Sequence, residues 1–205
     1  MIRLYHCPQT RSTRILWLLE ELGARDQVQL ELVSIRPGQS APKSPHTEGK
    51  VPLLEHDGVM IRESGAIVQY LNDLFPDAGL APGISDKERG AYLSWLHYYG
   101  GVIEPVLTMH MSSMEPDKLF TSTFRGFEEM EACLNDQLSK HPFLLGDHFS
   151  AADILIAAPF IWFPVMAPKA GAIQSWLQRC ATRPAFAKVT EEDTEFQTKM
   201  KNLAH

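Results

Sequence analysis

The sequence predicts two domains, a small α/β domain followed by a larger all-helical domain. Strand-like and helical segments alternate in the first part, whereas every periodic segment from Lys87 onward has helical spacing. Between these parts, residues 77–86 are rich in Gly, Pro and Asp, a composition typical of a linker. We therefore expect one domain at residues 1–77 and a second at residues 86–205.

The first domain is expected to follow the order β-α-β, an irregular link, then β-β-α. The link contains many Pro, Gly, Ser and Lys residues, and after it two apolar runs flank Asp57-Gly58, a strong hairpin signal. The expected elements are a strand at 2–5, a helix ending at Gly23, a strand at 28–35, the link at 37–50, the hairpin, and a helix from Ser64 to Pro76.

The second domain is expected to hold helices at about 87–112, 116–139, 151–167, 170–181 and 184–200. Ser150 and Asp153 stand three residues apart before an apolar run, which is the spacing of a capping box with Asp in place of Glu. Phe149, just before the cap, is placed to pack against Ile154. We therefore interpret Asp153 as a helix-nucleating residue and not as a catalytic one.

Composition excludes several classes of function. The 205 residues carry a net charge of -6, whereas a nucleic-acid binder needs a surplus of Lys and Arg, and the same balance disfavours an anionic membrane surface. No apolar run approaches the roughly 20 residues that span a bilayer, and the amino terminus lacks the pattern of a signal peptide. We expect a cytoplasmic protein without nucleic-acid or membrane partners.

The cysteines and histidines predict neither a disulfide framework nor a metal site. The three cysteines are far apart and no CxxC pair exists. The eight histidines form no HxH or HxxxH pair, and no Cys/His cluster has ligand spacing.

Val51-Pro52 is the first candidate for ligand binding. Proline at the start of a strand cannot donate a ladder hydrogen bond, so it belongs at an edge or in a special turn. A cis peptide there would leave the backbone N–H and C=O of Val51 open to an extended peptide. From position alone, a plain trans proline at a sheet edge is equally consistent.

Glu63-Ser64 is the second candidate, because it precedes a predicted helix. Ser64 is a natural N-cap, and the amides of the first turn form an anion site that a carboxylate could occupy. Glu63 is suited to a ligand ammonium group. For an isolated Glu-Ser pair, a helix cap beside a solvated acid is the commoner arrangement.

The loop between the first strand and the first helix is the third candidate. Tyr5, Cys7, Thr10 and Ser12 stand where a helix dipole stabilises a thiolate. Cys7 to Thr10 has the spacing of a CxxC redox site whose second Cys is Thr. That signal is weak, since single cysteines are more often inert core residues.

In order and spacing, four motifs resemble the cytosolic glutathione S-transferase superfamily, in its bacterial-type members, over essentially the whole chain. They are "STRILWLLEELG", "GKVPLLEHDG", "IRESGAIVQYL" and "LLGDHFSAADILIA". The resemblance implies a thioredoxin-like βαβαββα domain followed by an all-α domain, and a homodimer. It also implies glutathione as a co-substrate, a small hydrophobic electrophile as the second substrate, and no cofactor.

The resemblance also implies roles for individual residues. Pro52 is the expected cis-proline, and Val51 supplies backbone hydrogen bonds to the cysteinyl part of glutathione. Glu63 and Ser64 bind the γ-glutamyl group. Lys50, or the loop before it, meets the glycyl carboxylate.

At the position expected to contact the sulfur, this sequence does not match any one subclass of the family. Tyrosine-type enzymes place the activating hydroxyl near Tyr5, whereas in serine-type enzymes the register of the first helix selects Thr10, with Ser12 as second choice. Cys7-Pro8 resembles the cysteine-type pattern but lies a couple of residues early. Thr10 is our first expectation, and the other three candidates remain open.

The implied activity is stabilisation of the glutathione thiolate for attack on a small hydrophobic electrophile, with organic peroxides as further substrates. A Cys7-dependent thiol transferase or disulfide reductase is the enzymatic alternative, and a non-catalytic binding protein of the same fold is the other. Side chains expected to line the electrophile site are Tyr98, Tyr99, Val102, Met109, Met111 and Phe163.

Overall fold

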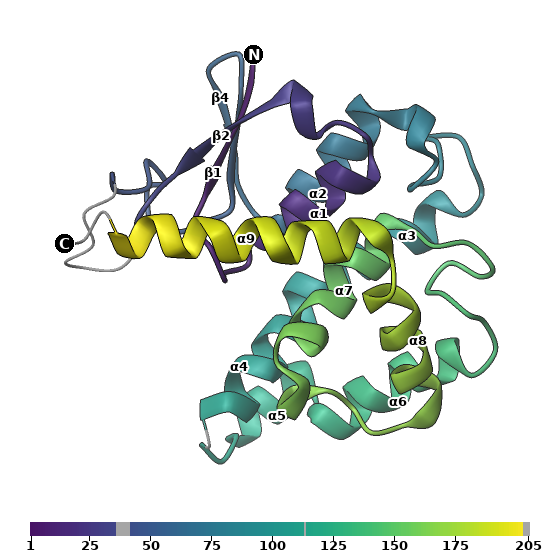
Figure 1. Ribbon diagram of the computed structural model, residues 1–205. Coiled ribbons are helices and arrows are strands. Elements are labelled where there is room, and N and C mark those ends of the chain that lie inside the picture. Colours follow the sequence, from purple (N-terminus) through teal and green to yellow (C-terminus); the bar gives the residue numbers. More distant parts are fainter. Residues whose placement is uncertain (36–41, 113, 203–205) are drawn as a thin grey trace. The chain divides into compact units, whose positions relative to one another are not determined.

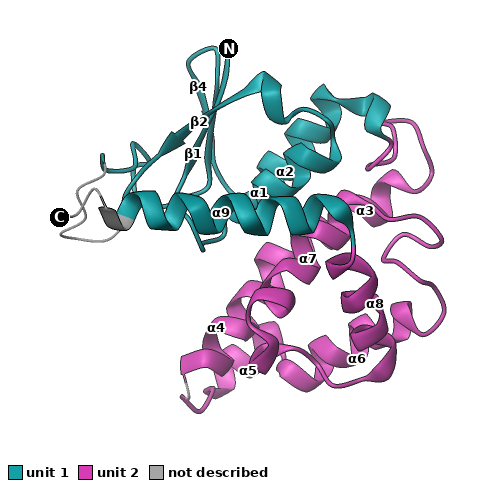
Figure 2. Ribbon diagram, viewed as in Figure 1, with its two compact units in different colours: residues 1–78, 183–205 teal, residues 79–182 magenta. Residues whose placement is uncertain are grey.

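The computed structural model describes residues 1–35, 42–112 and 114–202. The chain divides into two compact units, which Figure 2 shows in different colours. Unit 1 comprises residues 1–78 and 183–205, and unit 2 comprises residues 79–182. Each unit is described by itself below.

Unit 1 contains a mixed four-stranded sheet in its described residues, with the strand order β2-β1-β3-β4. β1 is parallel to β2 and antiparallel to β3, and β3 and β4 form the expected hairpin. The elements are β1 (Ile2–His6), α1 (Thr13–Glu21), β2 (Val28–Leu32), β3 (Leu53–His56), β4 (Val59–Ile61) and α2 (Ser64–Leu74). The described part of the link, residues 42–50, contains no helix.

The hairpin turn has the backbone that its sequence predicts. Asp57 and Gly58 have φ angles of 49° and 84°, which is the left-handed pair that a type I′ turn requires. The Asp57 carboxylate also pairs with the amino group of Met1. The turn therefore fixes the register in which β3 pairs with β4.

The last helix, α9 (Pro184–Asn202), packs along α1 and belongs to unit 1 (Figure 1). The expected second domain included this segment. Charged side chains hold this segment to α1: Arg183, just before α9, donates to both carboxylate oxygens of Glu21 at 2.6 Å, and Lys188 of α9 lies 2.6 Å from Glu20. Helical spacing in the sequence predicts this helix, but it does not show that the helix packs against the first domain.

Packing by α9 changes the environment of α1. Every residue from Thr13 to Leu19 is buried, including the polar Thr13 and Arg14. Trp17 lies edge-on against Phe186 of α9, with ring centroids 4.9 Å apart. The first turns of α1 are therefore buried, and this fixes the end of the loop that precedes the helix.

The regular elements of unit 2 are helices in its described residues. Its elements are α3 (Arg89–Tyr98), a π-helical turn (Tyr99–Ile103), α4 (Glu104–Ser112), α5 (Lys118–Phe124), α6 (Phe127–Leu138), α7 (Ala151–Trp162) and α8 (Gly171–Ala181). The single helix expected at 116–139 is divided in two, because Arg125 takes a φ of 62° and Gly126 caps α6. The predicted fold class, a thioredoxin-like domain with a helical domain, is confirmed.

The capping box at the start of α7 is confirmed. Asp153 accepts hydrogen bonds from the backbone N–H and the hydroxyl of Ser150, each at 2.9 Å. It also accepts from the Leu144 backbone N–H at 3.0 Å and the Trp176 indole N–H at 2.8 Å. Burial raises the pKa of the Asp153 carboxyl, and these donors oppose that rise.

Candidate functional site

The peptide bond between Val51 and Pro52 is cis, so the cis alternative of the prediction is confirmed. Both residues are buried and precede Leu53, which begins the pairing of β3 with Tyr5 of β1. The hydroxyl of Ser44 donates to the Lys50 carbonyl at 2.7 Å and holds the chain just before this turn. The turn is thus a fixed backbone feature at the end of the sheet.

The start of α2 differs from the prediction in one respect. Glu63, and not Ser64, occupies the N-cap position, and Ser64 is the first helical residue. Glu63 has a φ of 68°, an unusual angle for a residue other than glycine, and such outliers cluster at functional sites. The unpaired amides of the first turn give this end a positive partial charge beside an exposed carboxylate.

Charged side chains from three segments of unit 1 act on one another here. Glu48 raises the pKa of the Lys50 ammonium by a hydrogen bond and by its charge; its carboxylate lies 2.5 Å away. Glu63 raises that pKa further, while Arg11 lowers it. The link and the start of α2 meet, since the Arg62 side chain donates to the Thr47 hydroxyl at 3.3 Å. A pocket of about 400 Å³ beside them is lined by His46, Glu48, Met60, Ile61, Arg62 and Glu63.

Thr10 and Ser12 both face the Cys7 carbonyl, but only Thr10 is partly exposed. The Thr10 hydroxyl lies 2.6 Å from that oxygen and the Ser12 hydroxyl 3.0 Å. Ser12 is fully buried and also accepts from the Cys7 backbone N–H at 3.2 Å. Of the two hydroxyls, Thr10 is thus the one that a ligand can approach.

Cys7 and Tyr5 are tied into the interior of unit 1. Cys7 is 5% exposed and packs with Val33 and Val51 in a small apolar cluster, which Met200 of α9 also contacts. The hydroxyl of Tyr5 donates to Glu55 at 2.8 Å. Contact between Cys7 and Val51 brings the first loop against the cis-proline turn, so two of the predicted features meet.

Two residues near these features were not predicted. Arg11 adds a positive charge close to Lys50, and a basic residue within the candidate loop was the available signal. Asp193 of α9 accepts hydrogen bonds from the Gln9 backbone N–H at 2.8 Å and from the Thr13 hydroxyl at 3.2 Å. No spacing in the sequence links Asp193 to this loop, because most of the chain lies between them.

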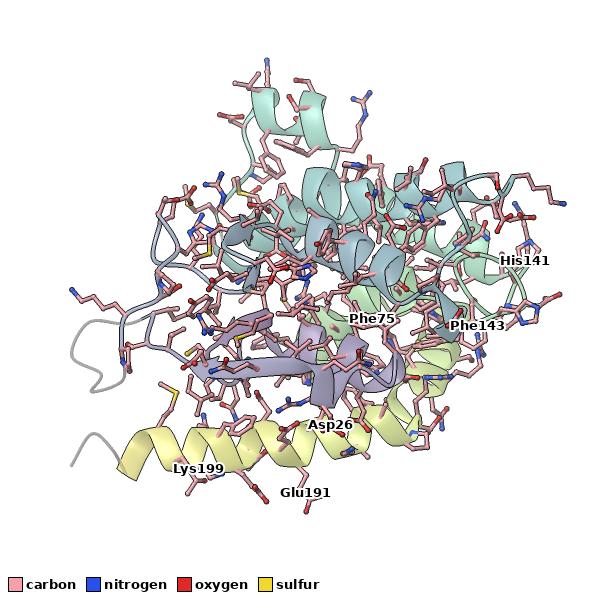
Figure 3. The ribbon with its side chains drawn as sticks, turned by 90° about the horizontal axis from the view of Figure 1, so that it is seen from above. Asp26, Phe75, His141, Phe143, Glu191 and Lys199 are labelled. Carbon is pink, nitrogen blue, oxygen red and sulfur yellow. The ribbon has the colours of Figure 1, made fainter. Side chains whose placement is uncertain are left out.

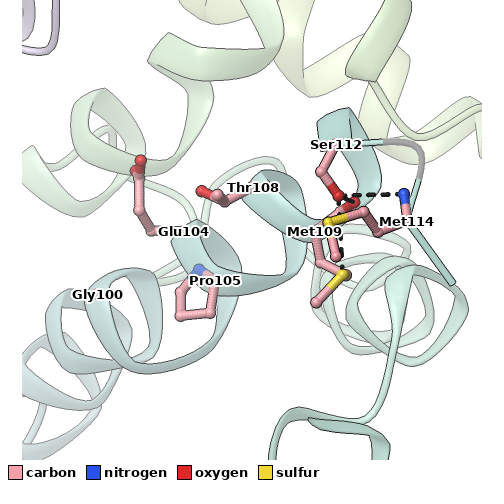
Figure 4. Close-up of a pocket in the computed structure, with 7 residues that line it drawn as sticks. All are labelled: Gly100, Glu104, Pro105, Thr108, Met109, Ser112 and Met114. Atoms are coloured by element: carbon pink, nitrogen blue, oxygen red, sulfur yellow. Dashed lines mark hydrogen bonds between the residues drawn. The ribbon is translucent and has the colours of Figure 1, made fainter. Parts of the chain in front are cut away.

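Unit 2 contains a mainly apolar pocket of about 420 Å³ along α4. Figure 4 shows its lining, which consists of Gly100, Glu104, Pro105, Thr108, Met109, Ser112 and Met114. Met109 was among the side chains predicted to line an electrophile site. Met111 and Phe163 are exposed instead, and Tyr99 is buried with its hydroxyl bonded to Glu104.

Comparison with known proteins identifies the family. Residues 4–79 match the N-terminal domain of glutathione S-transferases, and residues 119–189 match their C-terminal domain. The disulfide-bond oxidoreductase YfcG of Escherichia coli (strain K12) is 30% identical over 90% of this chain and 92% of its own length. The chain belongs to the glutathione S-transferase family.

Further members of this family align over similar lengths. Glutathione S-transferase 3 of Schizosaccharomyces pombe is 24% identical over 97% of this chain and 90% of its own length. The crystal structure of a glutathione transferase from Methylococcus capsulatus is 26% identical and superposes with a TM-score of 0.78. That match covers 95% of this chain and 99% of the other.

Two further properties of the described residues bear on the expectations from the sequence. None of the helices they form is both long and apolar enough to cross a bilayer. Among the same residues, no three His, Cys, Asp or Glu side chains gather as metal ligands would.

Proposed function

We propose that this family member is a glutathione transferase, which activates the thiol of glutathione for attack on small hydrophobic electrophiles. One observation carries the proposal: the cis-proline turn packs against the loop with Thr10, and the link that leads into this turn lines one pocket with the start of α2. A peptide notch, a helix N-terminus and a hydroxyl are the groups that a tripeptide with a reactive thiol requires.

In this proposal each part of glutathione has a partner. The backbone of Val51, set by Pro52, pairs with the cysteinyl residue. The carboxylate of the γ-glutamyl group accepts from the first amides of α2 at Ser64, and its ammonium pairs with Glu63. The glycyl carboxylate meets Lys50, which then exchanges part of its contact with Glu48 for the ligand.

The chemistry follows from the pKa of the thiol. A free thiol has a pKa near about 8.5, so little thiolate exists at neutral pH. A hydrogen bond from the Thr10 hydroxyl to the sulfur, near the N-terminus of α1, stabilises the thiolate and lowers this pKa. The thiol proton passes to solvent, the sulfur forms a bond to the electrophilic carbon, and the leaving group departs with its electron pair.

Replacing Thr10 with Val tests the activating group. We expect the pKa of the bound thiol to rise by about one unit and kcat/KM at neutral pH to fall about tenfold, because one unit corresponds to about 1.4 kcal/mol. The rate should recover at higher pH. Thr121→Val is the matched control, since Thr121 is an exposed threonine bonded to its own helix. A pH profile that Thr10→Val leaves unchanged would show that another group activates the thiol.

Reduction of disulfides is a second candidate function, because a relative of 30% identity is named a disulfide-bond oxidoreductase. The burial of Cys7 favours bound glutathione, and not Cys7, as the attacking thiol. We therefore expect Cys7→Ala to retain both conjugation and disulfide reduction, as should the exposed control Cys133→Ala. Near-complete loss of the reductase activity in Cys7→Ala alone would identify Cys7 as the nucleophile.

Calorimetry with glutathione separates the enzymatic proposals from a non-catalytic role of the same fold. Absence of binding at millimolar glutathione would eliminate both enzymatic functions. The homodimer is part of the proposal and is measured by sedimentation. Reduction of organic peroxides and a cytoplasmic location remain predictions.

A further inference from the structure

A chain of polar side chains runs from α9 through the interior of unit 1 to Thr10. The Asp193 carboxylate lies 2.8 Å from Nε2 of His6. Nδ1 of His6 lies 2.7 Å from the Ser12 hydroxyl, which lies 2.8 Å from the Thr10 hydroxyl. His6 and Ser12 are fully buried.

The same carboxylate also fixes the loop that carries Thr10. Its second oxygen accepts from the backbone N–H of Gln9 and from the hydroxyl of Thr13. Gln9 has a φ of 56°, an angle that its surroundings must stabilise. Because a buried carboxylate is costly unless it is paired, this arrangement of donors indicates that Asp193 has a specific role.

Ser, His and Asp side chains in contact also form the nucleophilic sites of hydrolases. In this protein, however, the Ser12 hydroxyl is not accessible to a substrate. The Ser12 hydroxyl contacts both the N–H and the carbonyl of Cys7 in the interior. The partly exposed member of the chain is Thr10. These polar side chains therefore reach the surface at the Thr10 hydroxyl, where glutathione is proposed to bind.

The number of hydroxyl protons shows how Ser12 can influence Thr10. Each hydroxyl has one proton to donate, and both Thr10 and Ser12 lie within reach of the Cys7 carbonyl. When Nδ1 of His6 lacks a proton, Ser12 donates to it, and Thr10 is left to donate to Cys7. When Nδ1 carries a proton, Ser12 accepts from His6 and donates to Cys7, which releases the proton of Thr10. Asp193 contacts the opposite nitrogen of the ring at 2.8 Å and so holds the ring against Ser12.

We propose that Asp193 is a positioning residue for the reaction, which acts through His6 and Ser12 to direct the Thr10 proton toward the sulfur of bound glutathione. The inference rests on the proposed function, with Thr10 as the activating group. The ionisable groups among these side chains are Asp193 from α9 and His6 from β1, and Cys7 lies against Ser12 in the same loop.

Asp193→Asn in the full chain tests the inference. The pKa of bound glutathione is read from the ultraviolet absorbance of its thiolate as pH is varied. We expect a rise of about one unit, an equal fall of about tenfold in kcat/KM at neutral pH, and a glutathione Kd changed by less than about threefold. Glu191→Gln is the control, because Glu191 is exposed and points away from the packed side of α9 (Figure 3).

Two variants of His6 separate the relay from simple packing. The amide of His6→Asn takes the place of Nδ1 and donates to Ser12, whereas that of His6→Gln reaches toward Nε2 and loses the contact with Ser12. We expect His6→Gln to raise the pKa of the bound thiol and His6→Asn to retain most of the wild-type value. Equal pKa values of the bound thiol in the two variants would overturn the inference. If Asp193→Asn does not fold, the comparison of the two His6 variants still tests it.

The failure of this inference is distinguishable from failure of the proposed function. If the wild type does not lower the thiol pKa of glutathione, the proposed function fails. If Thr10→Val raises this pKa and Asp193→Asn does not, only the role of Asp193 is wrong. Combining the two substitutions should add nothing to the effect of Thr10→Val, and a further rise would contradict a path through Thr10.

Discussion

Replacing Asp153 with Ala is expected to reduce the free energy of unfolding by about 3–5 kcal/mol, since it leaves several buried donors without an acceptor. The affected groups are the backbone N–H groups of Leu144 and Ser150 and the indole N–H of Trp176. They join the segment before α7 to α7 itself and to α8. The carboxylate therefore stabilises the interior of unit 2, and urea denaturation measures its contribution.

Asp136→Ala is the control for this measurement. Asp136 is an exposed carboxylate of α6 in the same unit, paired at 2.6 Å with Lys140, which lies just beyond the end of that helix. Such surface pairs contribute less than about 1 kcal/mol. If the two variants unfolded at similar urea concentrations, the assignment of Asp153 as the main buried acceptor would be wrong.

Replacing Glu63 with Ala is expected to weaken glutathione binding about 30- to 100-fold, which corresponds to about 2–3 kcal/mol for the loss of a charged hydrogen-bond partner. The reason is the proposed pairing of this carboxylate with the ligand ammonium at the start of α2. Isothermal calorimetry measures the change. Glu48→Ala is the control, because it removes a carboxylate from the same pocket and releases Lys50 for the ligand.

Glu63→Gly separates binding from backbone strain at this position. Glycine adopts the φ of 68° without cost, so this variant should unfold at an equal or higher urea concentration than the wild type. It should nevertheless lose glutathione affinity to the same degree as Glu63→Ala. Retained affinity in Glu63→Gly would show that the backbone conformation, and not the carboxylate, determines binding.

Features governed by local chemistry could be predicted from the sequence. Asp57-Gly58 forms its hairpin because both residues tolerate positive φ, and Gly23 follows the end of α1 with a φ of 62°. Ser150 and Asp153 form their capping box because the two residues lie within one helical turn. In each of these cases the interacting groups are few residues apart.

Features that depend on distant packing could not be predicted. The register of the first helix favoured Thr10 over Ser12, but only the structure shows that Ser12 is buried beside His6 while Thr10 is partly exposed. Glu63 was expected to precede the cap, and its place at the N-cap follows from the path of the chain out of β4. The burial of Cys7 likewise depends on Val33 and Val51, which come from other segments.

The sequence by itself therefore determined the fold class, the residues around which a glutathione site is expected, and the chemistry those residues offer. Only the tertiary structure decided that α9 packs on unit 1, that Cys7 and Ser12 lie inside, and that Asp193 contacts the loop carrying Thr10. The physical reason is range: turns and caps depend on neighbouring residues, whereas burial and long-range pairing depend on how α9 returns to cover α1.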